Sequence, residues 1–221
     1  MSVVGVGAVQ MRAYFSSYHL WAAQHFSQLA EAVEDQPGPA FNIAHRTYVT
    51  NAVFSAVAFL EASINEVFDD IADSHTSYVA TLSAETKRLL GGLWVGDETV
   101  ERWSVLDKYR VVLLSAGKPV FDKGTQPYQD AKLLLRLRNR LIHARPKTRD
   151  TGDIDKLEQS LSGRFESNRH MAKMANPYFP DQCLGAGCAN WAVVSARTFS
   201  DDFFSRLGIK PNYQQIDFGP A

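Results

Sequence analysis

Prolines divide this chain into long intervals, and each interval has the composition of a helix. Pro37 and Pro39 interrupt the chain early, and the next proline is Pro119. Because proline has no amide hydrogen and disrupts a helix interior, long helices are expected between prolines and not across them. Further prolines bound the later intervals, namely Pro127, Pro146, Pro177 and Pro180. The sequence therefore predicts a protein built from helices.

Apolar residues in the long proline-free interval recur with the period of a helix. They follow one another at alternating three- and four-residue steps: Val53, Val57, Leu60, Ile64, Val67 and Ile71. This spacing predicts one apolar face of a long helix over residues 44–72. Further helices are expected over residues 9–33, 84–90, 98–115, 128–144, 153–163 and 188–207. We expect Gly91 and Gly92 to end the third helix, and Trp103 to point inward from the fourth.

No alternating strand pattern of useful length is visible, so the predicted fold class is all-α. We expect a single domain over residues 1–221, formed as a bundle of about five to six helices. Its core would span about residues 40–147, with a loop-rich segment over 146–184 before a C-terminal helix over 184–208 that packs on the core. A length of 221 residues with 45% hydrophobic residues is enough for one sizeable core.

The composition also narrows the setting of the protein. The only two cysteines, Cys183 and Cys188, do not form a Cys-x-x-Cys pair, so neither a disulfide framework nor a zinc site is indicated. The start of the chain lacks a cationic signal region, and no stretch of about 18 uninterrupted apolar residues is present. We therefore expect a cytoplasmic protein with no membrane partner.

One segment is strongly basic although the whole chain carries a net charge of only −1. Residues 131–149 contain no Asp or Glu, and they contain the cations Lys132, Arg136, Arg138, Arg140, Arg145, Lys147 and Arg149. Such local charge is typical of a site that faces phosphate. The alternative is a basic last turn that complements the helix dipole and is stopped by Pro146.

Helix geometry separates the polar residues of this segment. At about 100° per residue, the leucines of residues 133–142 form an apolar arc, and Arg138 falls inside it. Asn139 and His143 lie on the other side, one turn apart, so their side chains can serve one site. Glu61 lies at the edge of the apolar face of the 44–72 helix, where an unpaired carboxylate is costly to desolvate. We therefore predict a Glu61 and Arg138 pair, whose alternative role is a core ion pair that only fixes helix register.

The segment resembles the signature of the HEPN superfamily of α-helical domains, which is Arg, a polar residue, three further residues and His. Here these are Arg138, Asn139, Arg140-Leu141-Ile142 and His143. Residues 51–62, including Glu61, are similar to the second long helix of these domains. The stretch Leu106-Asp107-Lys108-Tyr109, with the later Gly117-Lys118 and Phe121-Asp122, resembles the approach to the motif. The resemblance covers roughly residues 46–147.

Many HEPN proteins are metal-independent endoribonucleases, often toxins or antiviral effectors, that act as dimers with a shared cleft. The resemblance implies that His143 does acid–base work while the RNA 2′-hydroxyl attacks the adjacent phosphodiester, a role that suits a group titrating near neutrality. Arg138 would stabilise the charge on the phosphoryl oxygens, and Asn139 would orient either group. Four cations would hold the RNA backbone: Arg136, Arg140, Arg145 and Lys147. The expected partners are RNA, a second copy of the chain and a neutralising protein.

Two functions stay open from the sequence. The first is this endoribonuclease. The second is a catalytically silent HEPN-type module for binding protein or RNA or for dimerisation, in which the cations form only a solvated basic face. The other histidines show no Glu-x-x-His or His-Glu-x-x-His spacing, so no metal and no cofactor is predicted. Activity of the purified protein on RNA in the presence of chelator would separate the two functions.

Overall fold

A computed structural model of the chain describes residues 11–75, 78–96, 100–146, 148, 153–171 and 174–215. It is built from helices that are joined by turns and longer loops, and no strand occurs in these ranges. The α-helices are α1 (Phe15–Glu34), α2 (Ile43–Ala72), α3 (Ala84–Gly96), α4 (Val105–Ser115), α5 (Tyr128–Ile142), α6 (Lys156–Leu161) and α7 (Ala186–Leu207). The prediction of an all-α protein is therefore confirmed.

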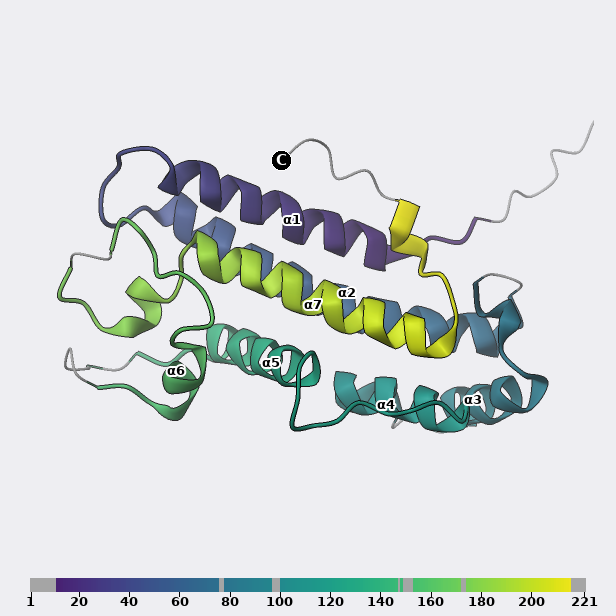
Figure 1. Cartoon of the computed structure of the whole chain (residues 1–221). Coiled ribbons are helices and arrows are strands. Elements are labelled where there is room, and N and C mark those ends of the chain that lie inside the picture. Colours follow the sequence, from purple (N-terminus) through teal and green to yellow (C-terminus); the bar gives the residue numbers. More distant parts are fainter. Residues whose placement is uncertain are drawn as a thin grey trace, which may run out of the picture.

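Helix α2 is the central element of the bundle. It begins at the cap residue Asn42, whose side chain accepts hydrogen bonds from the amides of Ala44 and His45 at 2.9 and 3.2 Å. Helices α1 and α7 run alongside α2, and α3, α4 and α5 follow one another along its other side (Figure 1). By length and composition alone α2 could cross a membrane, but much of it is buried in the bundle, as expected of a core helix.

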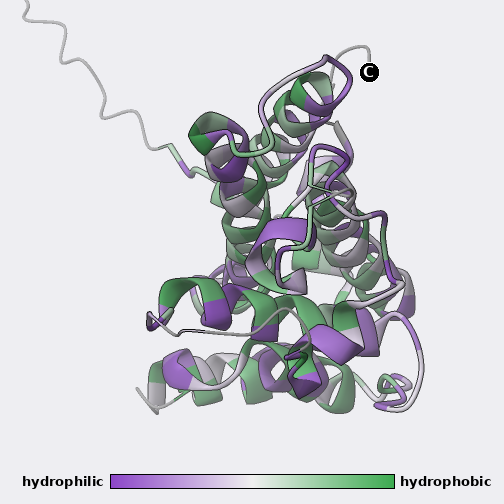
Figure 2. Cartoon of the chain, turned by 90° about the vertical axis from the view of Figure 1, so that its left-hand side faces the viewer, coloured by the Kyte–Doolittle hydropathy of each residue, from purple (hydrophilic) through white to green (hydrophobic). Residues whose placement is uncertain are grey.

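The core lies where α2, α4 and α7 meet. Tyr109 of α4 is fully buried and donates a hydrogen bond from its hydroxyl to the carbonyl oxygen of Leu60 at 2.9 Å. Its ring packs edge-on against Phe199 and Phe203 of α7, with centroids 4.9 and 4.6 Å apart. Seen from the end of the bundle, apolar and polar stretches alternate along the helices (Figure 2), as expected of amphipathic helices around a shared core.

Several predicted helix boundaries were wrong. The first helix begins at Phe15 and not at residue 9, and the helix expected over residues 153–163 spans only Lys156–Leu161. Helix α3 does not end at Gly91 and Gly92 but continues to Gly96. The reason is tertiary packing, since Trp94 stacks on Phe68 at 4.7 Å and donates its indole N–H to Asp69 at 2.8 Å. The stabilisation from these two Trp94 contacts outweighs the free-energy cost of placing two glycines in a helix.

The fourth helix begins later than expected, at Val105, after a 3₁₀ turn over Val100–Arg102. Ser104 is its cap, because its hydroxyl accepts a hydrogen bond from the amide of Asp107 at 3.2 Å. Trp103 therefore lies outside the helix, contrary to the prediction, but its partly buried side chain packs against the hydrophobic core, in line with the predicted inward position. Residues 97–99 of the predicted helix lie outside the described ranges.

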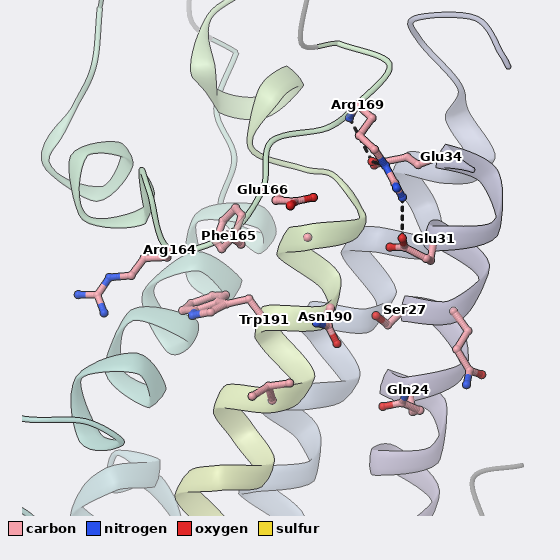
Figure 3. A pocket seen from close by; sticks show the side chains of 13 residues that line it. Gln24, Ser27, Glu31, Glu34, Arg164, Phe165, Glu166, Arg169, Asn190 and Trp191 are labelled. Atoms are coloured by element: carbon pink, nitrogen blue, oxygen red, sulfur yellow. Dashed lines mark hydrogen bonds and ion pairs between the residues drawn. The ribbon is translucent and has the colours of Figure 1, made fainter. Parts of the chain in front are cut away.

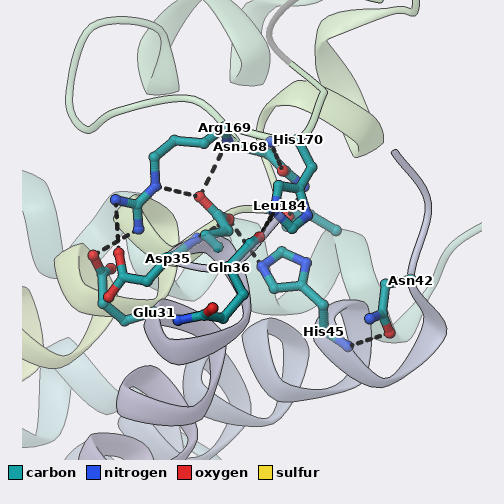
Figure 4. A network of polar contacts seen from close by, with 11 residues as sticks. Glu31, Asp35, Gln36, Asn42, His45, Asn168, Arg169, His170 and Leu184 are labelled. Atoms are coloured by element: carbon teal, nitrogen blue, oxygen red, sulfur yellow. Dashed lines mark hydrogen bonds and ion pairs between the residues drawn. The ribbon is translucent and has the colours of Figure 1, made fainter. Parts of the chain in front are cut away.

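A buried carboxylate joins four segments at one end of the bundle, in the polar network where Figure 4 shows His45 and Arg169. Glu34, the last residue of α1, lies 2.8 Å from Nε2 of His45 in α2 and accepts a hydrogen bond from the amide of Ala186, the first residue of α7, at 2.7 Å. The amide and Nε of Arg169 donate to the other carboxylate oxygen at 3.1 and 3.2 Å. Burial favours the neutral acid, but these contacts outweigh it and lower the pKa of Glu34 to about 2.

Candidate functional site

The motif residues occupy the last turn of α5 and the residue that follows it. Helix α5 buries Leu133, Leu134 and Leu137 against the bundle and ends at Ile142. His143 is the C-terminal cap, and its amide donates to the carbonyl oxygen of Asn139 at 3.0 Å. The side chains of Asn139 and His143 are both exposed.

Arg138 is held by the partner that helix geometry predicted. Its Nη2 lies 2.9 Å from Oε1 of Glu61 on α2, which confirms the expected pair. The Arg138 side chain is 25% exposed and that of Glu61 is 46% exposed, so the pair is more solvated than a core ion pair. Nε of Arg138 is buried and has no hydrogen-bond partner among the described residues. The guanidinium is therefore anchored at one corner only.

Arg140 is engaged within the protein. Its Nη1 lies 2.7 Å from Asp155, its Nη2 lies 3.5 Å from Glu158, and its guanidinium stacks over the ring of Phe179 at 4.9 Å. Asp155 and Glu158 form the capping box that begins α6. Arg140 thus connects the end of α5 to α6, and its predicted contact with RNA stays a prediction.

The other cations of the predicted RNA surface differ from Arg140, which is paired within the protein. Arg136 and Arg145 are exposed, and neither lies within ion-pair distance of a carboxylate among the described residues. Lys147 lies outside the described residues, as does Arg149.

Two clefts border the motif, and the three motif residues are divided between them. The first, which we call the tryptophan cleft, has a volume of about 440 Å³ and is lined by Glu61, Trp103, Asp107, Lys123, Lys132, Arg136, Arg138 and Asn139 among others. The second, the histidine cleft, has a volume of about 600 Å³ and is lined by Arg46, Thr50, Arg140, His143, Arg145 and Phe179 among others. Residues 138 and 143 lie roughly 140° apart around the helix axis, whereas residues 139 and 143 lie only roughly 40° apart. Asn139 and His143 nevertheless line different clefts, so the expectation that they serve one site was wrong.

A third cleft lies between α1, α7 and the segment that precedes α7 (Figure 3). Its volume is about 560 Å³. Both of its arginines are already paired, because Arg164 contacts Asp130 at 2.9 Å and Arg169 contacts Glu31 at 2.6 Å. None of the predicted site residues lines it. It therefore lacks the free cations that a phosphate site needs.

Residues that the sequence did not single out as site residues also line the tryptophan cleft. Lys132 precedes Arg136 by one turn of α5, so a count along the helix face could have included it. Trp103 and Lys123 come from connecting segments before α4 and before α5. Helix periodicity carries no information about such positions, and only the tertiary fold brings these residues to the motif.

Comparison with known proteins gives no relative: no family model, no curated protein and no solved structure matches this chain.

Proposed function

We propose that this protein is a metal-independent endoribonuclease of the HEPN type that acts in the cytoplasm as a homodimer. The observation that supports it best is the 2.9 Å contact between Arg138 of the motif and Glu61 of α2. This contact joins the two segments on which the resemblance depends. Around it lie the exposed Asn139 and His143, and two cations without ion-pair partners among the described residues, Arg136 and Arg145.

The proposed reaction is an intramolecular displacement on phosphorus. His143 accepts the proton of the RNA 2′-hydroxyl, and the 2′-oxygen attacks the adjacent phosphorus. The bond to the 5′-oxygen of the next nucleotide breaks, and the leaving oxygen takes up a proton from solvent water, which leaves a 2′,3′-cyclic phosphate and a 5′-hydroxyl. Arg138 stabilises the charge on the non-bridging oxygens through the edge of its guanidinium that Glu61 does not occupy. Asn139 orients the phosphate or the imidazole.

The division of the motif between two clefts supports an enzyme made of two copies. Arg138 and Asn139 line the tryptophan cleft, whereas His143 lines the histidine cleft. A dimer that meets at the end of α5 places His143 of one copy beside Arg138 of the other. Both groups then act on one phosphate, in line with the shared cleft that the resemblance implies.

The decisive experiment is cleavage of single-stranded RNA by the purified protein in EDTA. We expect the wild type to cleave and His143→Ala to lose about a hundredfold or more in rate, because acid–base catalysis contributes about 10²–10⁴-fold. The matched control is His19→Ala, since His19 lies on α1 away from both clefts. Full activity of His143→Ala contradicts the mechanism. A wild type that binds RNA without cleaving it indicates the silent binding module instead.

A further inference from the structure

Trp103 differs from the other three tryptophans in its surroundings. Trp21 stacks on His25, Trp94 on Phe68 and Trp191 lies against Phe165, with ring centroids 4.8, 4.7 and 5.3 Å apart. Within the described ranges the ring of Trp103 contacts no other aromatic ring, and it is partly exposed where it lines the tryptophan cleft. One part of the Trp103 side chain packs against the hydrophobic core, and its exposed part is available beside Arg138 and Asn139.

The same cleft carries cations that the protein does not neutralise. Lys123, Lys132 and Arg136 are exposed, and in the part of the chain that the structure describes no carboxylate lies within ion-pair distance of them. The two carboxylates of the cleft are already engaged, because Glu61 contacts Arg138 and Asp107 accepts a hydrogen bond from the Ser104 hydroxyl at 2.6 Å. The cleft is thus positive next to the exposed part of the Trp103 ring.

An aromatic ring beside unpaired cations has the chemistry of a single-stranded nucleic acid site, where bases stack on the ring and phosphates contact the cations. A volume of about 440 Å³ also falls within the range of about 300–1,000 Å³ that is usual for small-ligand clefts. The histidine cleft is less suited to stacking, because Arg140 already covers the ring of Phe179 at 4.9 Å. The third cleft has no unpaired arginine.

We infer that the tryptophan cleft binds one nucleotide of single-stranded RNA next to the scissile phosphate, with its base stacked on Trp103 and its phosphate held by Lys132 and Arg136. This inference rests on the proposed ribonuclease function, whose substrate it specifies as an unpaired strand. Double-stranded RNA is excluded from the cleft, because a base within a helix is covered by its neighbours and cannot stack on a side chain.

The test is binding of a short, fluorescein-labelled single-stranded oligonucleotide with 2′-O-methyl riboses, measured by anisotropy at low salt. The blocked 2′-oxygen prevents cleavage, so binding is measured apart from catalysis. We expect Trp103→Ala to weaken binding about tenfold, since stacking on one aromatic side chain contributes about 1–3 kcal/mol per base. The control Trp21→Ala, on α1, should bind as the wild type does. Equal affinity of Trp103→Ala and wild type overturns the inference, and so does a wild type that fails to bind the strand.

Trp103→Phe keeps an aromatic ring and so guards against a folding defect in Trp103→Ala. It should bind the strand nearly as well as the wild type, while the quenching of tryptophan fluorescence on binding is lost. Quenching that persists in Trp103→Phe overturns the inference, because another tryptophan then contacts the strand.

The cations are tested through salt dependence. Lys132→Ala and Arg136→Ala should each lower the slope of log affinity against log salt by about 0.7, the value for one phosphate contact on a single strand. Arg88→Ala, an exposed cation on α3, is the control and should leave the slope unchanged. Slopes equal to that of wild type in both cleft variants contradict the phosphate contacts. Binding of the blocked strand without cleavage of its all-ribose counterpart would reject the proposed catalysis and leave this inference standing.

Discussion

Arg138 of α5 and Glu61 of α2 meet across the interface of their helices, with Nη2 and Oε1 2.9 Å apart. A guanidinium pinned at Nη2 keeps a fixed position, and because Nε is buried, Nη1 is the donor that stays available to a phosphate. Glu61 therefore acts as a positioning residue for Arg138. Because nearly half of the Glu61 side chain is exposed, at 46%, the pair is expected to matter more for the site than for stability.

The first prediction separates these two effects. In a double-mutant cycle of Glu61→Ala and Arg138→Ala, thermal melts should give a coupling energy of about 1 kcal/mol or less, since water screens a partly exposed pair. Cleavage by Arg138→Ala should fall far more than this loss of stability explains. Arg138→Lys, which keeps the charge without the planar fork, should fold normally and cleave poorly. A coupling energy of several kcal/mol would show instead that the pair is a core element.

The second prediction concerns the pH dependence of stability. The folded state holds the pKa of Glu34 at about 2, against its ordinary value of 4.5, so the folded protein releases this proton more readily than the unfolded chain. The stabilisation is therefore complete above about pH 4.5 and is lost as the pH falls toward 2. By linkage it amounts to about 3 kcal/mol, at about 1.4 kcal/mol per pH unit.

Denaturant unfolding of wild type and Glu34→Gln from pH 7 to pH 2 would measure this contribution. The variant should be less stable near neutrality and should show a shallower decline over the acid range. Glu31→Gln is the matched control, because Glu31 contacts the same Arg169 from an exposed position. Parallel pH profiles for wild type and Glu34→Gln would argue against a buried, ionised Glu34.

The third prediction uses two helical glycines as a matched pair. A Cβ atom at Gly187 in α7 would lie 2.5 Å from the carbonyl oxygen of Glu166, so the segment before α7 would have to move. Gly187→Ala should therefore cost more than 1 kcal/mol. At Gly92 in α3 the Cβ would meet nothing within 4 Å, so Gly92→Ala should stabilise by about 0.5–1 kcal/mol through helix propensity. Melting temperatures that move in the same direction for both variants would contradict this packing.

Sequence patterns predicted those features that follow from the spacing of residues along regular helices. The apolar face of α2 and the Arg138 and Glu61 pair both follow from residue spacing on helices with few interruptions. The partners of Arg140 were missed, since Asp155 and Glu158 come from a later segment whose docking onto α5 no periodicity encodes. The end of α3 was missed for a related reason, because Trp94 and its stacking partner are far apart in sequence.

The same distinction applies to the candidate site. Asn139 and His143 lie one turn apart as expected, but they line different clefts and do not share one site. The division of the motif between two clefts and the presence of Trp103 in one of them depend on how α4 and the preceding turn pack beside α5. Those contacts arise only when the whole bundle is assembled.

The carboxylate of Glu34 couples the local unfolding of the segments that it contacts. It serves as the counter-charge at the start of α7, where unpaired amides give a helix its positive end, and it also closes α1 against α2 through His45. If any one of these segments moves away, the buried Glu34 carboxylate loses a hydrogen-bond donor and is left incompletely paired. Local fraying at this end of the bundle is therefore coupled, and we expect the amides of Ala186 and Arg169 to exchange their hydrogens with solvent at a common rate, as one cooperative unit.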